Sequence, residues 1–107
     1  MPQFEVVWTE SAQNDLIRII KYIEYDGKEI AKNIYRKIKS KVVSLKDMPL
    51  QGRVLPELGQ YGIDDYRELI ENPWRIIYKT GDHNIYIIAV IDGRRDMEDL
   101  LRERTIP

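Results

Sequence analysis

The sequence predicts an α+β fold: an N-terminal strand, an antiparallel α-helical hairpin packed on an antiparallel β-sheet, and a short C-terminal helix. Three patterns predict these elements. Residues 3–8 alternate as a strand does, residues 12–45 carry two apolar stripes at helical spacing, and residues 66–91 hold three β-rich runs separated by turns. Helices followed by a run of neighbouring strands are typical of the α+β class.

Length and composition exclude several classes of protein. At 107 residues, of which 43% are hydrophobic, the chain can bury one core and not two, so we expect a single domain over residues 1–107. Zero cysteines and one histidine exclude disulfides and thiolate metal sites, and we expect neither metal nor cofactor. No window approaches the roughly 18 apolar residues of a membrane span, and the N-terminus does not resemble a signal peptide. We therefore expect a cytoplasmic protein without membrane contact.

The helical hairpin follows from the spacing of apolar residues. Thr9 or Ser11 can cap the first helix, Gly27 suits the turn that ends it, and Pro49 ends the second. Because the linking turn is short, the helices must pack as an antiparallel hairpin, with lysines mainly on the outer face of the second. The two buried stripes consist of Ala12, Leu16, Ile19, Ile20 and Ile23, followed by Ala31, Ile34, Ile38, Val42 and Leu45.

The second half of the chain predicts an antiparallel meander. Residues 49–62 contain three glycines and two prolines and read as a loop, whereas 66–71, 74–80 and 85–91 read as strands. The third run is apolar on both faces, so we expect it at the centre of the sheet, covered on one side by the hairpin. The cover of the other side is expected from the C-terminal segment 97–106, with Met97, Leu100 and Leu101 at helical spacing.

Four arginines are the candidates for a functional site. Arg67 and Arg75 lie on adjacent predicted strands, and Arg94 and Arg95 directly follow the third, so we expect them to converge at one edge of the sheet. Guanidinium groups held together repel one another unless an anion is close, and they bind phosphate or carboxylate in bidentate fashion. The alternative is that each arginine pairs locally with a carboxylate from Glu68, Glu71, Asp92 or Asp96.

With these motifs, YRELIENPWRIIYK and AVIDGRRD, and with its order of elements, the chain resembles the RelE/ParE superfamily of toxins from bacterial type II toxin-antitoxin systems, also called plasmid stabilisation proteins. The resemblance covers essentially the whole chain. The matching residues are Tyr66 and Arg67 opening one strand, Trp74, Arg75, Ile76, Ile77 and Tyr78 in the next, and Gly93, Arg94 and Arg95 in the final turn.

The resemblance implies one of two targets and an antitoxin partner. RelE-like toxins cut mRNA in the ribosomal A site, with basic residues that bind the phosphate and a general base for the ribose hydroxyl, whereas ParE-like toxins block DNA gyrase. For a nuclease, the resemblance makes Arg67, Arg75 and Arg95 catalytic. The sequence differs from the RelE-like nucleases at two positions. Leu69 and Leu101 stand where those nucleases carry a lysine and a tyrosine.

Arginine exchanges protons poorly, so these departures favour a ParE-like toxin. We therefore expect growth inhibition through DNA gyrase, neutralised by a cognate antitoxin in a hetero-oligomer. A ribosome-dependent mRNA endoribonuclease and a non-toxic antitoxin-binding relic are the alternatives, so enzymatic activity stays open. For either target, the candidate binding residues are Arg67, Arg75, Arg94, Arg95 and Tyr78.

The remaining candidates also have structural explanations that require no functional role. Tyr78 alternates with core positions, which favours a structural role, and His83 falls in a turn that needs no catalytic explanation. The basic face of the second helix is typical of a solvated surface, while its lysine density also suits an acidic partner or nucleic acid.

Overall fold

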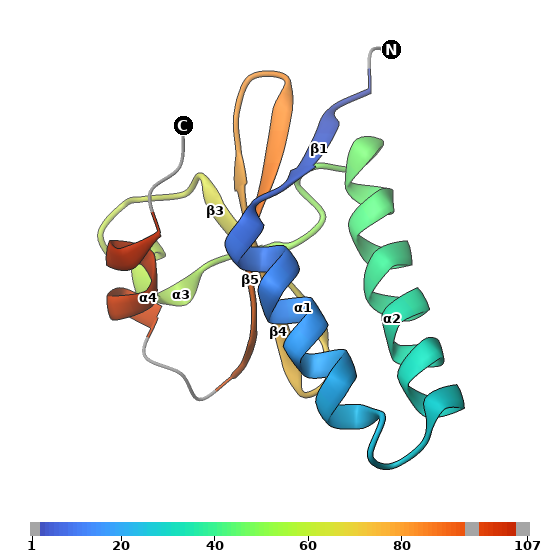
Figure 1. The fold of residues 1–107 in the computed structure, drawn as a ribbon. Helices are drawn as coiled ribbons and strands as arrows, with labels where there is room; N and C mark the ends of the chain where they lie inside the picture. The colour runs from blue at the N-terminus through green and yellow to red at the C-terminus, as the bar shows by residue number, and fades with distance from the viewer. Residues whose placement is uncertain (1–2, 94–96, 105–107) are drawn as a thin grey trace.

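The computed structural model describes residues 3–93 and 97–104, and it confirms the predicted α+β architecture (Figure 1). The chain begins with strand β1, the helices α1 and α2 of the hairpin, and a single 3₁₀ turn. It then continues through β2, α3, the β3–β4–β5 meander and α4. The bounds are β1 Glu5–Trp8, α1 Glu10–Ile23, α2 Lys28–Val43, the 3₁₀ turn Ser44–Lys46, β2 Arg53–Val54, α3 Pro56–Gly59, β3 Tyr66–Glu71, β4 Trp74–Thr80, β5 Asn84–Asp92 and α4 Met97–Glu103.

The helical hairpin forms as predicted. Of the two candidate caps, Thr9 is the one used, since its hydroxyl accepts a hydrogen bond from the backbone N–H of Ala12 at 3.2 Å. Gly27 lies between the helices at a φ of 152°, a conformation that side chains disfavour. The turn is short, so α1 and α2 run antiparallel and side by side (Figure 1).

The sheet is mixed rather than antiparallel, which corrects the prediction. Its order is β1-β5-β4-β3-β2, and the meander from β3 to β5 is antiparallel, but β1 joins β5 in parallel. The alternation of residues 5–8 indicates a strand and carries no information about the direction of a partner nearly eighty residues away.

The middle strand of the sheet is β4 and not β5, which is a second correction. The segment predicted to be a loop contains β2, whose two residues pair with Glu68 and Arg67 of β3 and so add a strand at the far edge. A two-residue strand is too short to show a period of two. The same segment also holds α3, a single turn that begins at Pro56.

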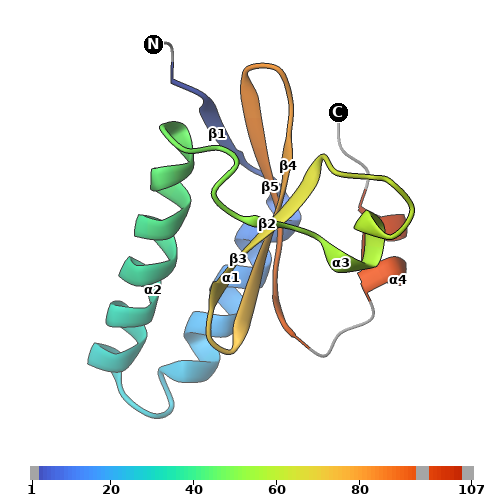
Figure 2. The ribbon, with the colours of Figure 1, turned by 180° about the vertical axis from the view of Figure 1, so that it is seen from behind.

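Two apolar clusters fill the space on either side of the sheet. The hairpin covers one face, while α3 and α4 cover the other, as Figures 1 and 2 show. Met97 and Leu100 of α4 are buried there, which confirms the predicted cover, although α4 ends at Glu103. No helix in the described ranges is both long and apolar enough to cross a bilayer.

A β-bulge interrupts the alternation of side chains in the apolar run of β5. Ile77 pairs with Ala89 and Tyr78 pairs with Ile87, so Ile88 has no opposite residue on β4. The bulge places Ile88 and Ala89 together in the cluster beneath α3 and α4. Both faces of the sheet are covered, so the five consecutive apolar residues from Ile87 to Ile91 are all buried.

Candidate functional site

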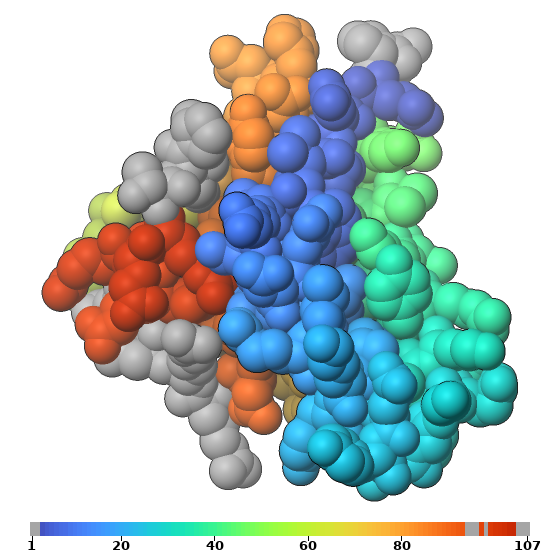
Figure 3. All heavy atoms as spheres, viewed as in Figure 1, coloured from blue at the N-terminus to red at the C-terminus, as the bar shows by residue number. Residues whose placement is uncertain are grey.

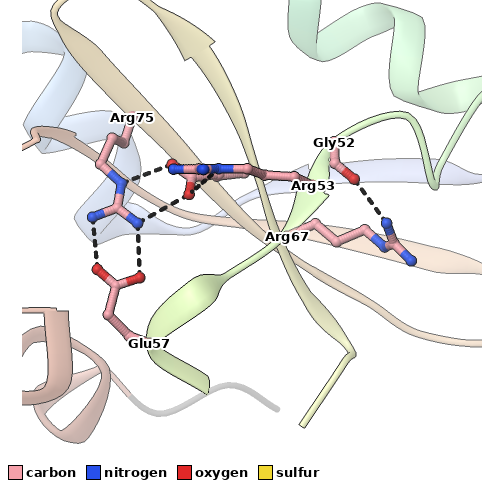
Figure 4. Close-up of polar contacts among 6 residues, drawn as sticks. Gly52, Arg53, Glu57, Arg67 and Arg75 are labelled. Atoms are coloured by element: carbon pink, nitrogen blue, oxygen red, sulfur yellow. Dashed lines mark hydrogen bonds and ion pairs between the residues drawn. The ribbon is translucent and has the colours of Figure 1, made fainter. Parts of the chain in front are cut away.

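Arg67 and Arg75 lie on opposite faces of the sheet, so the expected convergence of these two side chains is wrong. Arg67 pairs with Tyr78 across the β3–β4 ladder, and Arg75 pairs with Ile70. Because side chains alternate along a strand, Arg67 shares the hairpin face with Tyr78, and Arg75 shares the opposite face with Ile77. Figure 4 shows the two side chains with separate partners, Arg75 reaching Glu57 and Arg67 reaching Gly52.

Arg75 is held between two carboxylates. Its Nε and Nη2 donate to Glu68 at 2.7 and 3.0 Å, and its Nη1 and Nη2 donate to Glu57 at 2.8 and 2.9 Å (Figure 4). Arg53 donates to Glu68 from the other side at 3.0 Å. Two arginines and two glutamates thus form a network of balanced charge, which is called the carboxylate network below.

Burial differs sharply within the carboxylate network. The side chain of Glu68 is 0% exposed and that of Arg75 is 11% exposed, whereas that of Glu57 is 31% exposed. A buried carboxylate is costly unless it is paired and hydrogen-bonded, and Glu68 meets both conditions through its two arginines. Arg75 is therefore required for the burial of Glu68, while Glu57 closes the network on the solvent side.

Hydrogen bonding between Arg75 and its carboxylate partners favours the charged forms of Arg75 and Glu57. The hydrogen bonds from Arg75 lower the pKa of Glu57, and those to Glu57 and Glu68 raise the pKa of Arg75 further above its already high value. Arg75 therefore stays protonated and can act only as a fixed cation. It cannot serve as a general acid or base.

Arg67 has a different set of partners, the backbone carbonyls of the segment before β2. Its Nη1 donates to the carbonyl oxygens of Gly52 at 2.7 Å and Leu50 at 3.3 Å. The Tyr78 hydroxyl accepts from the Gly52 N–H at 3.0 Å and donates to the Pro49 carbonyl at 2.9 Å. Arg67 and Tyr78 together fasten residues 49–52 to the sheet. These two side chains and their three partners, Pro49, Leu50 and Gly52, are called the loop staple below.

Gly52 is required at the centre of the loop staple. A Cβ at this position would lie 2.5 Å from the Glu68 carbonyl oxygen and 2.7 Å from the Tyr78 hydroxyl. Tyr78 is fully buried, and burial raises the pKa of its hydroxyl. In this conformation Tyr78 supports the loop and has no surface to offer a target.

The structure thus separates the sequence-predicted residues. Arg75 pairs with Glu68, as the local-pairing alternative predicts, and Arg67 binds carbonyls. Arg94 and Arg95 lie outside the described residues. A target-binding or catalytic role for any of them stays a prediction.

Sequence reasoning missed a second buried carboxylate. Asp15 of α1 is 3% exposed; it accepts from the Val90 N–H at 3.0 Å and from Arg104 at 2.6 and 3.0 Å. Arg104 also donates to the Ile88 carbonyl at 2.8 Å. These two side chains form hydrogen bonds with backbone groups of β5 beyond the end of β1, where no strand among the described residues pairs with β5. The signal was present, because Asp15 falls within the apolar stripe of the first helix, four residues before Ile19.

The outer surface of the hairpin is hollowed between α1 and α2, which lie side by side in Figure 3. Ile20, Ala31 and Tyr35 line a hollow of about 530 Å³, and a smaller one beside it reaches Ile17, which is half exposed. Lys28, Lys32 and Arg36 also line the larger hollow, together with Glu24. These residues, apolar at the base and mainly basic around it, are called the hairpin groove below. Within residues 3–93 and 97–104, no group of three or more potential metal ligands occurs.

Comparison with known proteins gives consistent matches. The family model described as the ParE toxin of the type II toxin-antitoxin system, parDE, matches residues 6–97. Toxin ParE3 of Caulobacter vibrioides is 26% identical over 101 residues, which cover 94% of this chain and 97% of that protein. A chain from the chromosomal ParDE TA system of P. aeruginosa superposes with a TM-score of 0.69 at 22% identity, covering 84% of this chain and 96% of the other, and so shows the same fold.

Proposed function

Because the chain belongs to the ParE toxin family of type II toxin-antitoxin systems, we propose that it arrests bacterial growth by inhibiting DNA gyrase and that a cognate antitoxin neutralises it. Gyrase, as a protein target, would be bound through surface contacts and would require no bond chemistry from the toxin. Both partners would meet the toxin in the cytoplasm.

The separation of Arg67 and Arg75 is the observation that carries the choice of gyrase over mRNA. Cleavage of RNA needs cations gathered around one phosphate and a group that exchanges a proton. Arg75 is balanced by two carboxylates, and Arg67 lies on the other face of the sheet. A guanidinium group exchanges protons poorly, so it is a weak general acid or base. This arrangement supports a toxin that binds a protein rather than one that cuts mRNA.

The hairpin groove supports an antitoxin partner of a particular chemistry. Helix α2 carries six lysines or arginines and one glutamate, and the groove has an apolar base that includes Ile20 and Ala31. An amphipathic helix with acidic residues beside its apolar face would match both features. We assign this groove to the antitoxin.

Supercoiling by purified gyrase tests the proposed target. With ATP and relaxed plasmid, the protein is expected to suppress supercoiling and to leave linearised plasmid, and Arg102→Ala, at an exposed position on α4, should act as the parent does. Intact supercoiling at saturating, folded protein would contradict the proposal. New 5′ ends in translated mRNA would favour the ribosome-dependent nuclease instead.

Co-purification with the product of the neighbouring gene tests the antitoxin. Complex formation is expected with the parent and with Lys46→Glu, which changes a basic residue outside the groove, and it should weaken in Lys32→Glu/Arg36→Glu. Equal binding by all three proteins would remove the assignment of the groove. A complex whose toxin causes no growth arrest when expressed alone would indicate the non-toxic relic.

A further inference from the structure

We propose that Arg75 is a masked docking point for an aspartate or glutamate side chain of a protein partner, and that Glu57 occupies this place in the free protein. The protein nature of the partner rests on the function proposed above. The exchange involves one ion pair, in which the partner's carboxylate replaces that of Glu57 on the same edge of the guanidinium.

The guanidinium of Arg75 has two edges with different roles. The edge formed by Nε and Nη2 binds Glu68, whose side chain is wholly buried. The edge formed by Nη1 and Nη2 binds Glu57, which is 31% exposed. The first edge is structural because its loss would leave a buried charge without a main partner. The second edge faces the solvent side, and a ligand can reach it when Glu57 moves.

Glu57 can move without unfolding the segment that carries it. Helix α3 is a single turn, and it is anchored by Leu55, which is fully buried and whose N–H donates to the Tyr66 carbonyl at 2.9 Å. Glu57 contributes only its side chain to the carboxylate network. Rotation of that side chain therefore opens the outer edge of Arg75 while α3 stays in place.

The charge of the opened site specifies the ligand. Without Glu57, Arg53 and Arg75 face only the carboxylate of Glu68, so one positive charge is left uncompensated. The ligand should supply one negative charge and two oxygens in the plane of the guanidinium. A carboxylate does both, and the geometry of Glu57 on Arg75 shows that it fits.

Glu57 acts on the affinity of the site as an intramolecular competitor. A ligand binds only the fraction of molecules in which Glu57 has swung away, so its apparent affinity falls by that fraction. Glu57→Gln keeps the shape of the side chain and removes its charge, which should raise the open fraction. We expect ligand binding to tighten by about three- to fivefold.

Fluorescence anisotropy with labelled polyglutamate as the probe tests this directly. Three variants accompany the parent: Glu57→Gln, Glu57→Gln/Arg75→Lys, and Glu5→Gln, which makes the same charge change at an exposed position of β1. Arg75→Lys keeps a cation beside Glu68 and removes the two-pronged edge. The gain is expected in Glu57→Gln alone and should be lost in the double variant.

Polyglutamate can also bind the basic face of α2, and the double variant measures that contribution because its α2 is unchanged. Absence of a gain in Glu57→Gln, or a gain that survives Arg75→Lys, would overturn the proposal. A larger gain for a labelled oligothymidylate of equal charge would overturn the assignment to a carboxylate. The anisotropy assay contains neither gyrase nor antitoxin, so a negative result in it does not contradict the proposed function. A negative result in the gyrase assay likewise does not contradict the binding of a carboxylate to Arg75.

Discussion

The two faces of the β3–β4 ladder use the same type of side chain for different purposes. On the outer face, Arg75 binds two carboxylates and balances a buried charge. On the hairpin face, Arg67 binds backbone carbonyls and fixes the path of the chain before β2. The two arginines lie on adjacent strands, so strand register, and not residue type, decides which role each one has.

The largest expected effect comes from breaking the carboxylate network at Arg75. Arg75→Met leaves the fully buried Glu68 paired only with Arg53, whose side chain is 63% exposed. Removing one member of a buried ion pair leaves an undercompensated charge, so the free energy of unfolding should fall by about 3 kcal/mol. Urea denaturation measures it. Arg102→Met, at an exposed position, should change the same quantity by less than about 0.5 kcal/mol, and an equally small effect of Arg75→Met would show that Glu68 does not depend on it.

The next effect tests the close packing of the loop staple. In Gly52→Ala the new methyl group would collide with the backbone of Glu68 and with the ring of Tyr78, which should cost about 2 to 3 kcal/mol of stability. The matched control is Gly93→Ala, whose methyl group would lie 3.6 Å from Cδ of Arg75, at ordinary contact distance. Thermal unfolding of both variants should show a large shift for the first and little for the second. Similar shifts in the unfolding temperature of the two variants would contradict the tighter packing that we assign to Gly52.

A smaller effect is expected when the Tyr78 hydroxyl is removed. Tyr78→Phe leaves the Gly52 N–H and the Pro49 carbonyl without this partner, which should lower stability by about 1 to 2 kcal/mol. Because burial raises the pKa of Tyr78 above its ordinary value of 10.0, its contribution is complete below that value and is lost as pH rises through the folded-state pKa. The parent should therefore lose stability in alkali more steeply than Tyr78→Phe, and parallel curves of unfolding free energy against pH would contradict the assignment.

The smallest effect concerns Glu57. Since hydrogen bonding to Arg75 lowers its pKa below the ordinary value of 4.5, the stability it contributes is complete above that value and is lost as pH falls through the lower folded-state pKa. At neutral pH, Glu57→Gln should cost less than about 1 kcal/mol, because the pair is partly exposed. Denaturation curves recorded from neutral to acid pH should converge for parent and variant. If the difference in unfolding free energy between parent and variant widened in acid, a residue other than Glu57 would carry the stabilising charge.

Elements with a sustained local period were predictable, and elements defined by distant contacts were not. The bounds predicted for β3 and β4, at 66–71 and 74–80, are those observed, because each run has strand-like composition and ends at turn residues. The parallel pairing of β1 and the two-residue β2 depend on contacts that leave no local pattern. The bulge at Ile88 could not be predicted either, because an unbroken apolar run has no alternation that a bulge would interrupt.

The candidate site shows the same limit, with one exception. Glu57 lies in a segment without periodicity, and its contact with Arg75 spans 18 positions of the chain, so no sequence pattern indicated it. The separation of Arg67 from Arg75 was accessible. A tight turn at residues 72 and 73 pairs Glu71 with Trp74, and counting back along both strands places the two arginines on opposite faces.

The separate roles of Arg67 and Arg75 are tested most directly by a double-mutant cycle on the free energy of unfolding. Arg67→Lys, Arg75→Lys and the double variant should lose stability additively, within about 0.5 kcal/mol, because the two side chains share no hydrogen-bond partner in the described structure and lie on opposite faces. A coupling energy above about 1 kcal/mol would contradict this account, because it would show that the two arginines interact within one cluster.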